Sequence, residues 1–111
     1  DVMMPDIKYS GGPDEIIELD TFFSKYNIEF SPHNPSDPIA HAHSIQICSV
    51  STPCLLEYQY KESDKFDSIM NILNTPIINS KVSTATSEKG LGVSINMENL
   101  LKDDINSHKT Q

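Results

Sequence analysis

The sequence of this 111-residue chain predicts an α/β fold with parallel strands. In residues 1–60, short apolar runs alternate with segments of helical periodicity in the order strand, helix, strand, helix, strand. Short connections between such units imply parallel strands joined by right-handed crossovers. Each apolar run also ends near a proton-handling side chain, namely Asp6, His33 or Glu57. Because the carboxyl ends of parallel strands share one face of a sheet or barrel, these three side chains are expected at a common pocket.

The first strand, residues 2–5, is followed by a predicted helix that begins at Pro13. Gly11 and Gly12 interrupt the strand segment, and proline is favoured at the first helical position. The acidic residues that follow it suit the positive end of a helix. Apolar residues at three- and four-residue spacing predict about four turns, and they are Ile16, Leu19, Phe23 and Tyr26.

The second strand, residues 28–30, leads into a proline-stiffened loop that displays His33. Asp37 supplies a capping side chain and Pro38 a first-turn proline, so a second helix is predicted from there through about Ser49. A third strand is predicted over residues 54–60.

The pattern changes after residue 60. A third amphipathic helix is predicted from Phe66, Ile69, Met70 and Leu73, and it stops at Thr75 and Pro76. Short strands are then expected at 77–78, 82 and 93–95, with a tight turn at 90–92. Asn96 caps a short final helix that contains Leu100 and Leu101. Residues 61–103 thus form a separate carboxy-terminal segment, and residues 104–111 a polar tail.

Composition excludes several classes of function. A net charge of −8 and the lack of clustered Lys and Arg argue against nucleic-acid binding. No apolar run approaches the roughly 20 residues needed to cross a bilayer, so a soluble, cytoplasmic protein is expected. Cys48 and Cys54 are interpreted as thiols in a reducing compartment, with a disulfide as the alternative. A start at Asp1 within an apolar run suggests the carboxy-terminal part of a longer protein.

Four motifs occur in order along the chain: Met4-Pro5-Asp6-Ile7-Lys8-Tyr9-Ser10-Gly11-Gly12, Ser31-Pro32-His33-Asn34-Pro35, Leu56-Glu57-Tyr58-Gln59 and Gly90-Leu91-Gly92-Val93. In this order and spacing they resemble the enolase superfamily, more narrowly its mandelate racemase branch and the acid-sugar dehydratases similar to galactonate dehydratase. The resemblance runs from residue 1 to about residue 102.

The resemblance implies the carboxy-terminal portion of a modified TIM barrel. It places residues 1–60 at the last three strands and residues 61–103 in the segment that joins the capping domain. It makes Asp6 and His33 a catalytic dyad and Glu57 the functional glutamate of the last strand. It also implies Mg²⁺ as the cofactor of the intact parent, with metal ligands on upstream strands, so no metal ligand is expected in this chain.

The chemistry of these residues can be stated apart from the family. Removing a proton beside a carboxylate creates an enediolate whose charge needs a cation or hydrogen-bond donors. Histidine suits the proton transfer because its ordinary pKa lies near neutrality, and Asp6 would hold the imidazole of His33 in one tautomer. The imidazolium could then protonate a departing hydroxyl, and a neutral Glu57 could donate a hydrogen bond to the substrate carboxylate.

Each residue also has a structural interpretation that its spacing alone leaves open. Asp6 could cap the turn before the paired glycines, His33 could be a solvent-facing loop residue, and Glu57 could face water on an antiparallel strand. Lys8 and Tyr9 could reach the pocket mouth or contact only a helix or a charged neighbour. The resemblance favours the catalytic interpretation of Asp6, His33 and Glu57.

His41 and His43 suggest a metal site at first sight. Residues two apart on a helix point to different faces, so they are not expected to chelate one ion. Two departures from the family pattern are Asp37 in place of a common glycine, interpreted as a helix cap, and Lys89 in place of a common proline, interpreted as neutral for catalysis.

The leading hypothesis is that this chain is the carboxy-terminal part of a magnesium-dependent acid-sugar dehydratase, a carbon-oxygen lyase. The chain alone is expected to be inactive. A racemase or epimerase of a 2-hydroxy acid is the alternative within enzymes, and a non-catalytic fragment or binding module is the alternative outside them. The expected partner is a small acid-sugar substrate, and unpaired edge strands favour homo-oligomers.

Overall fold

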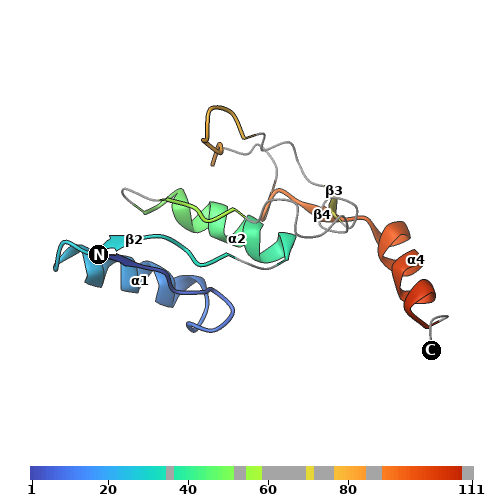
Figure 1. Ribbon diagram of the computed structural model, residues 1–111, viewed down its shortest axis with the longest axis horizontal. Coiled ribbons are helices and arrows are strands. Elements are labelled where there is room, and N and C mark those ends of the chain that lie inside the picture. The colour runs from blue at the N-terminus through green and yellow to red at the C-terminus, as the bar shows by residue number, and fades with distance from the viewer. Residues whose placement is uncertain (35–36, 52–54, 59–69, 72–76, 85–88, 109–111) are drawn as a thin grey trace.

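The computed structural model describes residues 1–34, 37–51, 55–58, 70–71, 77–84 and 89–108, with backbone only for 70–71 and 103–108. Figure 1 shows the amino-terminal part, with the first two strands and helices together, and the helix α4 (Met97–His108) at the opposite end of the molecule.

The first two strands run parallel, as the sequence predicts. β1 (Val2–Met3) pairs with β2 (Glu29–Phe30), and Val2 lies opposite Glu29. Pairing resumes three residues later at a parallel bridge between Asp6 and His33. Both side chains therefore follow the carboxyl ends of neighbouring parallel strands.

The helix α1 (Pro13–Ser24) connects these strands and begins where the sequence predicts. Gly12 has a φ of 98°, a backbone conformation that costs glycine little, and Pro13 is the first helical residue. The predicted apolar face extends too far, because it includes Tyr26. The helix ends at Ser24, Asn27 adopts a left-handed φ of 54°, and Tyr26 is exposed outside the helix.

The helix α2 (Pro38–Cys48) starts with the predicted cap. Oδ1 of Asp37 accepts hydrogen bonds from the backbone N–H groups of Ile39 (3.0 Å) and Ala40 (2.9 Å). These are orphan donors of the first turn, which an N-cap side chain satisfies.

Replacing Asp37 with alanine is expected to lower the free energy of unfolding by about 1 kcal/mol, because those donors lose their acceptor. Asp37→Asn retains an oxygen at the same position and should behave like the wild type. Equal denaturant midpoints for the alanine and asparagine variants would show that the cap contributes nothing.

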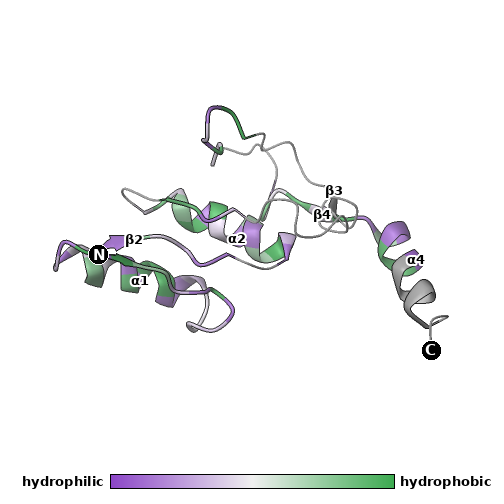
Figure 2. Cartoon of the chain, viewed as in Figure 1, coloured by the Kyte–Doolittle hydropathy of each residue, from purple (hydrophilic) through white to green (hydrophobic). Residues whose placement is uncertain are grey.

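The hydrophobic core lies between the two helices and the second strand. Its buried residues are Ile16, Phe23, Phe30 and Ile47, with Ile7, Leu19 and Ile28 packed against them. Figure 2 shows apolar residues along β1, α1 and α2, whereas the loop from β1 to α1 is mostly polar. This core fixes the strands relative to the helices and so positions the strand ends.

The third predicted strand is not formed in its described part. Residues 55–58 join no ladder with the other described strands, and Cys54, Gln59 and Tyr60 lie outside the described residues. Two hydrogen bonds from Asn34 to Glu57 hold the segment instead. These bonds link the segment to the loop that carries His33.

The predicted helix over 66–73 is wrong where the structure describes it. Met70–Asn71 forms the strand β3, antiparallel to β4 (Ser94–Ile95), and the rest of that segment lies outside the described residues. Helical spacing of a few apolar residues cannot exclude a strand when a partner strand is available. The strand predicted at 93–95 is confirmed over Ser94–Ile95.

The remaining predictions for the carboxy-terminal part concern short strands, a tight turn and a helix cap. Ile78 forms an antiparallel bridge with Lys81, and Gly90 and Gly92 have positive φ values of 67° and 71° in the predicted tight turn. Oδ1 of Asn96 accepts from the N–H of Asn99 at 3.1 Å, which confirms the cap of α4. The helix extends to His108, into the residues that the sequence reads as a polar tail.

Candidate active site at the ends of the parallel strands

Asp6 lies three residues beyond the end of β1 and is both a turn residue and a partner of His33. Its backbone carbonyl accepts from the N–H groups of Tyr9 (3.0 Å) and Ser10 (2.9 Å), and its Oδ1 accepts from the N–H of Lys8 (2.8 Å). The residue is 8% exposed. The turn therefore fixes the carboxylate and leaves Oδ2 directed at a second group.

That second group is the imidazole of His33. Its Nδ1 lies 3.2 Å from Oδ2 of Asp6, and the side chains of His33 and Asp6 are 43% and 9% exposed. A carboxylate oxygen only accepts hydrogen bonds, so Nδ1 carries the hydrogen and Nε2 is left as the basic nitrogen. A buried carboxylate that orients a half-exposed imidazole in this way is the arrangement of a general acid–base pair.

Glu57 approaches the same loop from the third segment. Its Oε2 accepts a hydrogen bond of 2.7 Å from the backbone N–H of Asn34, the residue after His33. The structure thus brings Asp6, His33 and Glu57 to one place, as the sequence predicts for their positions. Oε2 accepts from this N–H, which leaves Oε1 as the oxygen that could contact a substrate.

A buried polar cluster beneath these residues was not predicted. Nδ2 of Asn34 lies 2.6 Å from Nδ1 of His41 and donates to the backbone carbonyl of Glu57 at 3.1 Å. Asn34 is 2% exposed and His41 9%. The rings of His41 and Tyr58 meet edge to face, with centroids 5.3 Å apart. In the sequence, the signal that His41 faces inward is its position among the apolar residues of α2.

The pKa of the His41 imidazole lies below its ordinary value of 6.5 because burial disfavours the charged form. The unfolded chain therefore takes up a proton near pH 6.5 that the folded chain resists, and its stability falls as the pH drops below that value. The loss ends only once the pH is below the lowered folded-state pKa.

We therefore expect the free energy of unfolding, measured by denaturant titration from about pH 8 to about pH 5, to decline on the acid side of 6.5. His41→Asn removes the titrating group and should flatten this part of the profile, whereas His43→Asn should leave it in place. An unchanged slope in His41→Asn would contradict the assignment.

The described residues do not make a cation site by themselves. In the part of the chain that the structure describes, no three His, Cys, Asp or Glu side chains come together as ligands. Asp6 and His33 contact each other, and Oε2 of Glu57 contacts a backbone N–H.

Other sequence candidates lie outside this cluster. The Nζ of Lys8 lies 5.4 Å from the ring centroid of Tyr9, and Tyr9 is 83% exposed, so this pair is a cation–π contact in the turn. Cys48 is half-buried at the end of α2, and Cys54 lies outside the described residues. No helix in the described ranges is long and apolar enough to cross a membrane.

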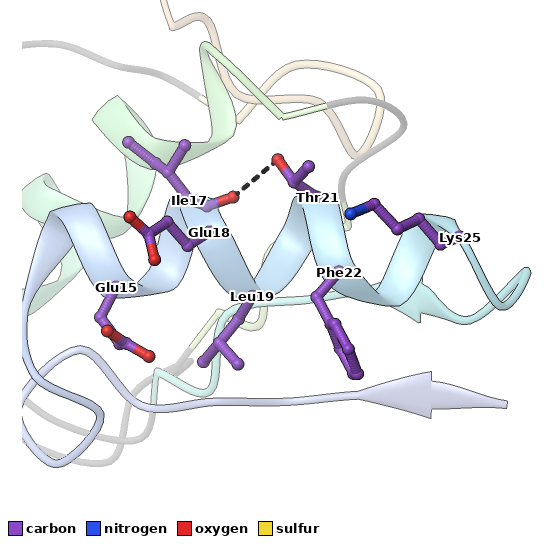
Figure 3. Close-up of a pocket in the computed structure, with 7 residues that line it drawn as sticks. All are labelled: Glu15, Ile17, Glu18, Leu19, Thr21, Phe22 and Lys25. Atoms are coloured by element: carbon purple, nitrogen blue, oxygen red, sulfur yellow. Dashed lines mark hydrogen bonds between the residues drawn. The ribbon is translucent and has the colours of Figure 1, made fainter.

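Figure 3 shows a hollow on α1 that is separate from the strand ends. Its lining residues come from this helix and from Lys25, which follows it: Glu15, Ile17, Glu18, Leu19, Thr21, Phe22 and Lys25. Thr21 Oγ1 donates to the carbonyl of Ile17 at 3.1 Å, so it serves the helix itself. A hollow formed by a single helix does not surround a small molecule, and it contains none of the three candidate residues.

Parallel strands that place an aspartate and a histidine at their carboxyl ends, with helices packed beside them, are the arrangement found in α/β barrels and in open α/β sheets. Residues 1–99 match the model of the family described as "Enolase C-terminal domain-like". The chain belongs to this family, and the fold class predicted from the sequence, a portion of its TIM barrel, is confirmed.

Among curated proteins, the chain is similar to D-galactonate dehydratase of Xanthomonas campestris pv. campestris (strain B100), with 31% identity over 107 residues. The match covers 91% of this chain and 28% of that protein. The protein of the same description from Xanthomonas euvesicatoria pv. vesicatoria (strain 85-10) is 29% identical over 111 residues, 95% of this chain and 29% of its own length. The chain thus spans less than a third of these relatives.

A solved structure gives the same fold. It is a mandelate racemase/muconate lactonizing enzyme-like protein from Rubrobacter xylanophilus DSM 9941, with a TM-score of 0.77 and 24% identity. The match covers 89% of this chain and 25% of that chain.

Proposed function

We propose that this chain supplies the Asp6–His33 side of the active site of an acid-sugar dehydratase, a carbon-oxygen lyase. The observation that carries the proposal is the contact of 3.2 Å between His33 Nδ1 and Asp6 Oδ2 at the ends of paired parallel strands. Similarity to D-galactonate dehydratases supports the reaction class and suggests sugar acids as substrates.

In the proposed reaction, Nε2 of His33 takes the proton from the carbon next to the substrate carboxylate. The C–H electron pair moves into an enediolate, and the C–O bond at the neighbouring carbon breaks. The imidazolium returns its proton to the departing hydroxyl, which leaves as water, and the enol product tautomerises to a keto acid. Asp6 stabilises the imidazolium, and Glu57 in its neutral form would donate a hydrogen bond to the substrate carboxylate as negative charge grows there.

Mg²⁺ is the proposed cofactor, because a divalent cation is the usual means of stabilising an enediolate. The described residues do not hold it, so its ligands are proposed to lie on other strands of the barrel. Self-association through unpaired strand edges is proposed as well, and sedimentation velocity at micromolar concentration tests it.

The test is keto-acid formation by the full-length protein from a panel of acid sugars, D-galactonate included, with Mg²⁺ present. Water elimination that is lost in the Asp6 and His33 variants supports the dehydratase. Exchange of the α-proton with inversion, and no keto acid, would identify a racemase or epimerase instead. Binding of acid sugars with no turnover would identify a binding module.

A further inference from the structure

The loop that carries His33 and the segment that carries Glu57 are joined by a buried amide. Asn34 makes two hydrogen bonds to Glu57: its backbone N–H donates to Oε2 at 2.7 Å, and its Nδ2 donates to the backbone carbonyl at 3.1 Å. These two bonds tie Glu57 to the residue that follows His33.

The orientation of the Asn34 amide follows from its neighbours. A backbone carbonyl can only accept, so the amide atom 3.1 Å from the Glu57 oxygen is the nitrogen. The second hydrogen of the same nitrogen points at Nδ1 of His41, 2.6 Å away. Nδ1 of His41 must therefore accept, which makes His41 a neutral imidazole with its hydrogen on Nε2.

The opposite arrangement is disfavoured. If Nδ1 of His41 carried a hydrogen, it would face a donor, and turning the amide to relieve this would set Oδ1 of Asn34 against the Glu57 carbonyl. The Glu57 carbonyl would then face a second acceptor in a buried site and would lose its donor. Oδ1 of Asn34 has no partner among the described residues, so the amide is held by its nitrogen alone.

We propose that His41 is a positioning residue for Glu57: its unprotonated Nδ1 fixes the Asn34 amide, and the amide holds Glu57 against the loop of His33. This inference rests on the proposed function for the role of Glu57, but the hydrogen-bond arrangement itself does not. Desolvation of His41, which is buried, favours the neutral form that the arrangement requires.

The first test needs no activity. Nitrogen-15 NMR of the histidine rings in the full-length protein at about pH 7.5 should report His41 with Nδ1 unprotonated and Nε2 protonated. A hydrogen on Nδ1 of His41 would overturn the proposal, whatever reaction the protein catalyses.

The second test uses substitutions of matched shape. Asparagine carries its Oδ1 two bonds from Cβ, where histidine carries Nδ1, so His41→Asn keeps an acceptor for Asn34. His41→Leu fills similar space without one. His43→Leu, on the same helix and half-buried, is the control. The carbon-13 carboxyl signal of Glu57 should shift in His41→Leu and stay near its wild-type position in His41→Asn and His43→Leu.

Kinetics then connect the residue to the site. His41→Leu should lower kcat/KM by about 10-fold and His41→Asn by less than about 3-fold. In a Glu57→Ala background, His41→Leu should cost less than about 2-fold more, because the group that it positions is gone. Equal losses in both backgrounds would overturn the positioning role while the dehydratase stands. No turnover by the wild type would refute the proposed function, and the NMR tests would still decide the role of His41.

Discussion

Replacing His33 with asparagine in the full-length protein is expected to reduce kcat for dehydration by about 100- to 10,000-fold, the range typical of a lost general acid–base group. Asparagine can place its amide nitrogen where Nδ1 lies and keep a hydrogen bond to Oδ2 of Asp6. It has no counterpart of Nε2, so proton transfer is removed while the local contact survives.

The control for this variant is His43→Asn, which replaces a half-buried histidine that does not contact Asp6 or Glu57 in any described interaction. It should retain kcat within about 3-fold, in line with the small effects of substitutions away from a site. The His33 side chain is 43% exposed, so its variant should unfold at a denaturant concentration close to that of the wild type. Full activity of a folded His33→Asn protein would remove His33 from the chemistry.

Asp6→Asn is expected to lower kcat by an amount on the order of 1,000-fold, because an amide at this position can leave the histidine in the wrong tautomer. Asparagine keeps an oxygen to accept from the Lys8 N–H, but it sets an N–H₂ group against Nδ1 of His33. Nδ1 would then accept, and the hydrogen would move to Nε2, the nitrogen that must act as base.

The matched control is Asp37→Asn, the same change at a carboxylate that caps α2, and it should leave kcat unchanged. The pH profile of kcat/KM separates a catalytic effect from a structural one. Loss of the carboxylate that stabilises the imidazolium should change the acidic and basic sides of this profile. An Asp6→Asn enzyme with a wild-type rate and profile would reduce Asp6 to its turn role.

Local signals account for what the sequence predicts well. Pro13 and Asp37 specify helix starts through backbone sterics and a cap, both of which depend on a few adjacent residues. The parallel pairing of β1 and β2 follows from the intervening helix, and it brings Asp6 and His33 to one edge. The turn role and the pairing role of Asp6, which spacing leaves as alternatives, are both present.

The predictions that fail depend on contacts between residues that are distant in the sequence. The backbone of Met70–Asn71 pairs with Ser94–Ile95, which local helical periodicity cannot reveal. Glu57 accepts a hydrogen bond from the N–H of Asn34, and the amide of Asn34 contacts His41, seven residues further along the chain. The two-residue spacing of His41 and His43 argues against a shared metal ion, but the role of His41 as a buried acceptor depends on a loop that only the folded chain places beside it.

Asp6 and His33 are proposed to act as one unit. A double-substitution cycle of kcat distinguishes this from two independent contributions. If the carboxylate works only through the imidazole, the Asp6→Asn, His33→Asn protein should be no more than about 3-fold slower than the slower single variant. Losses that multiply, so that the double variant shows the product of the two single effects, would contradict the dyad.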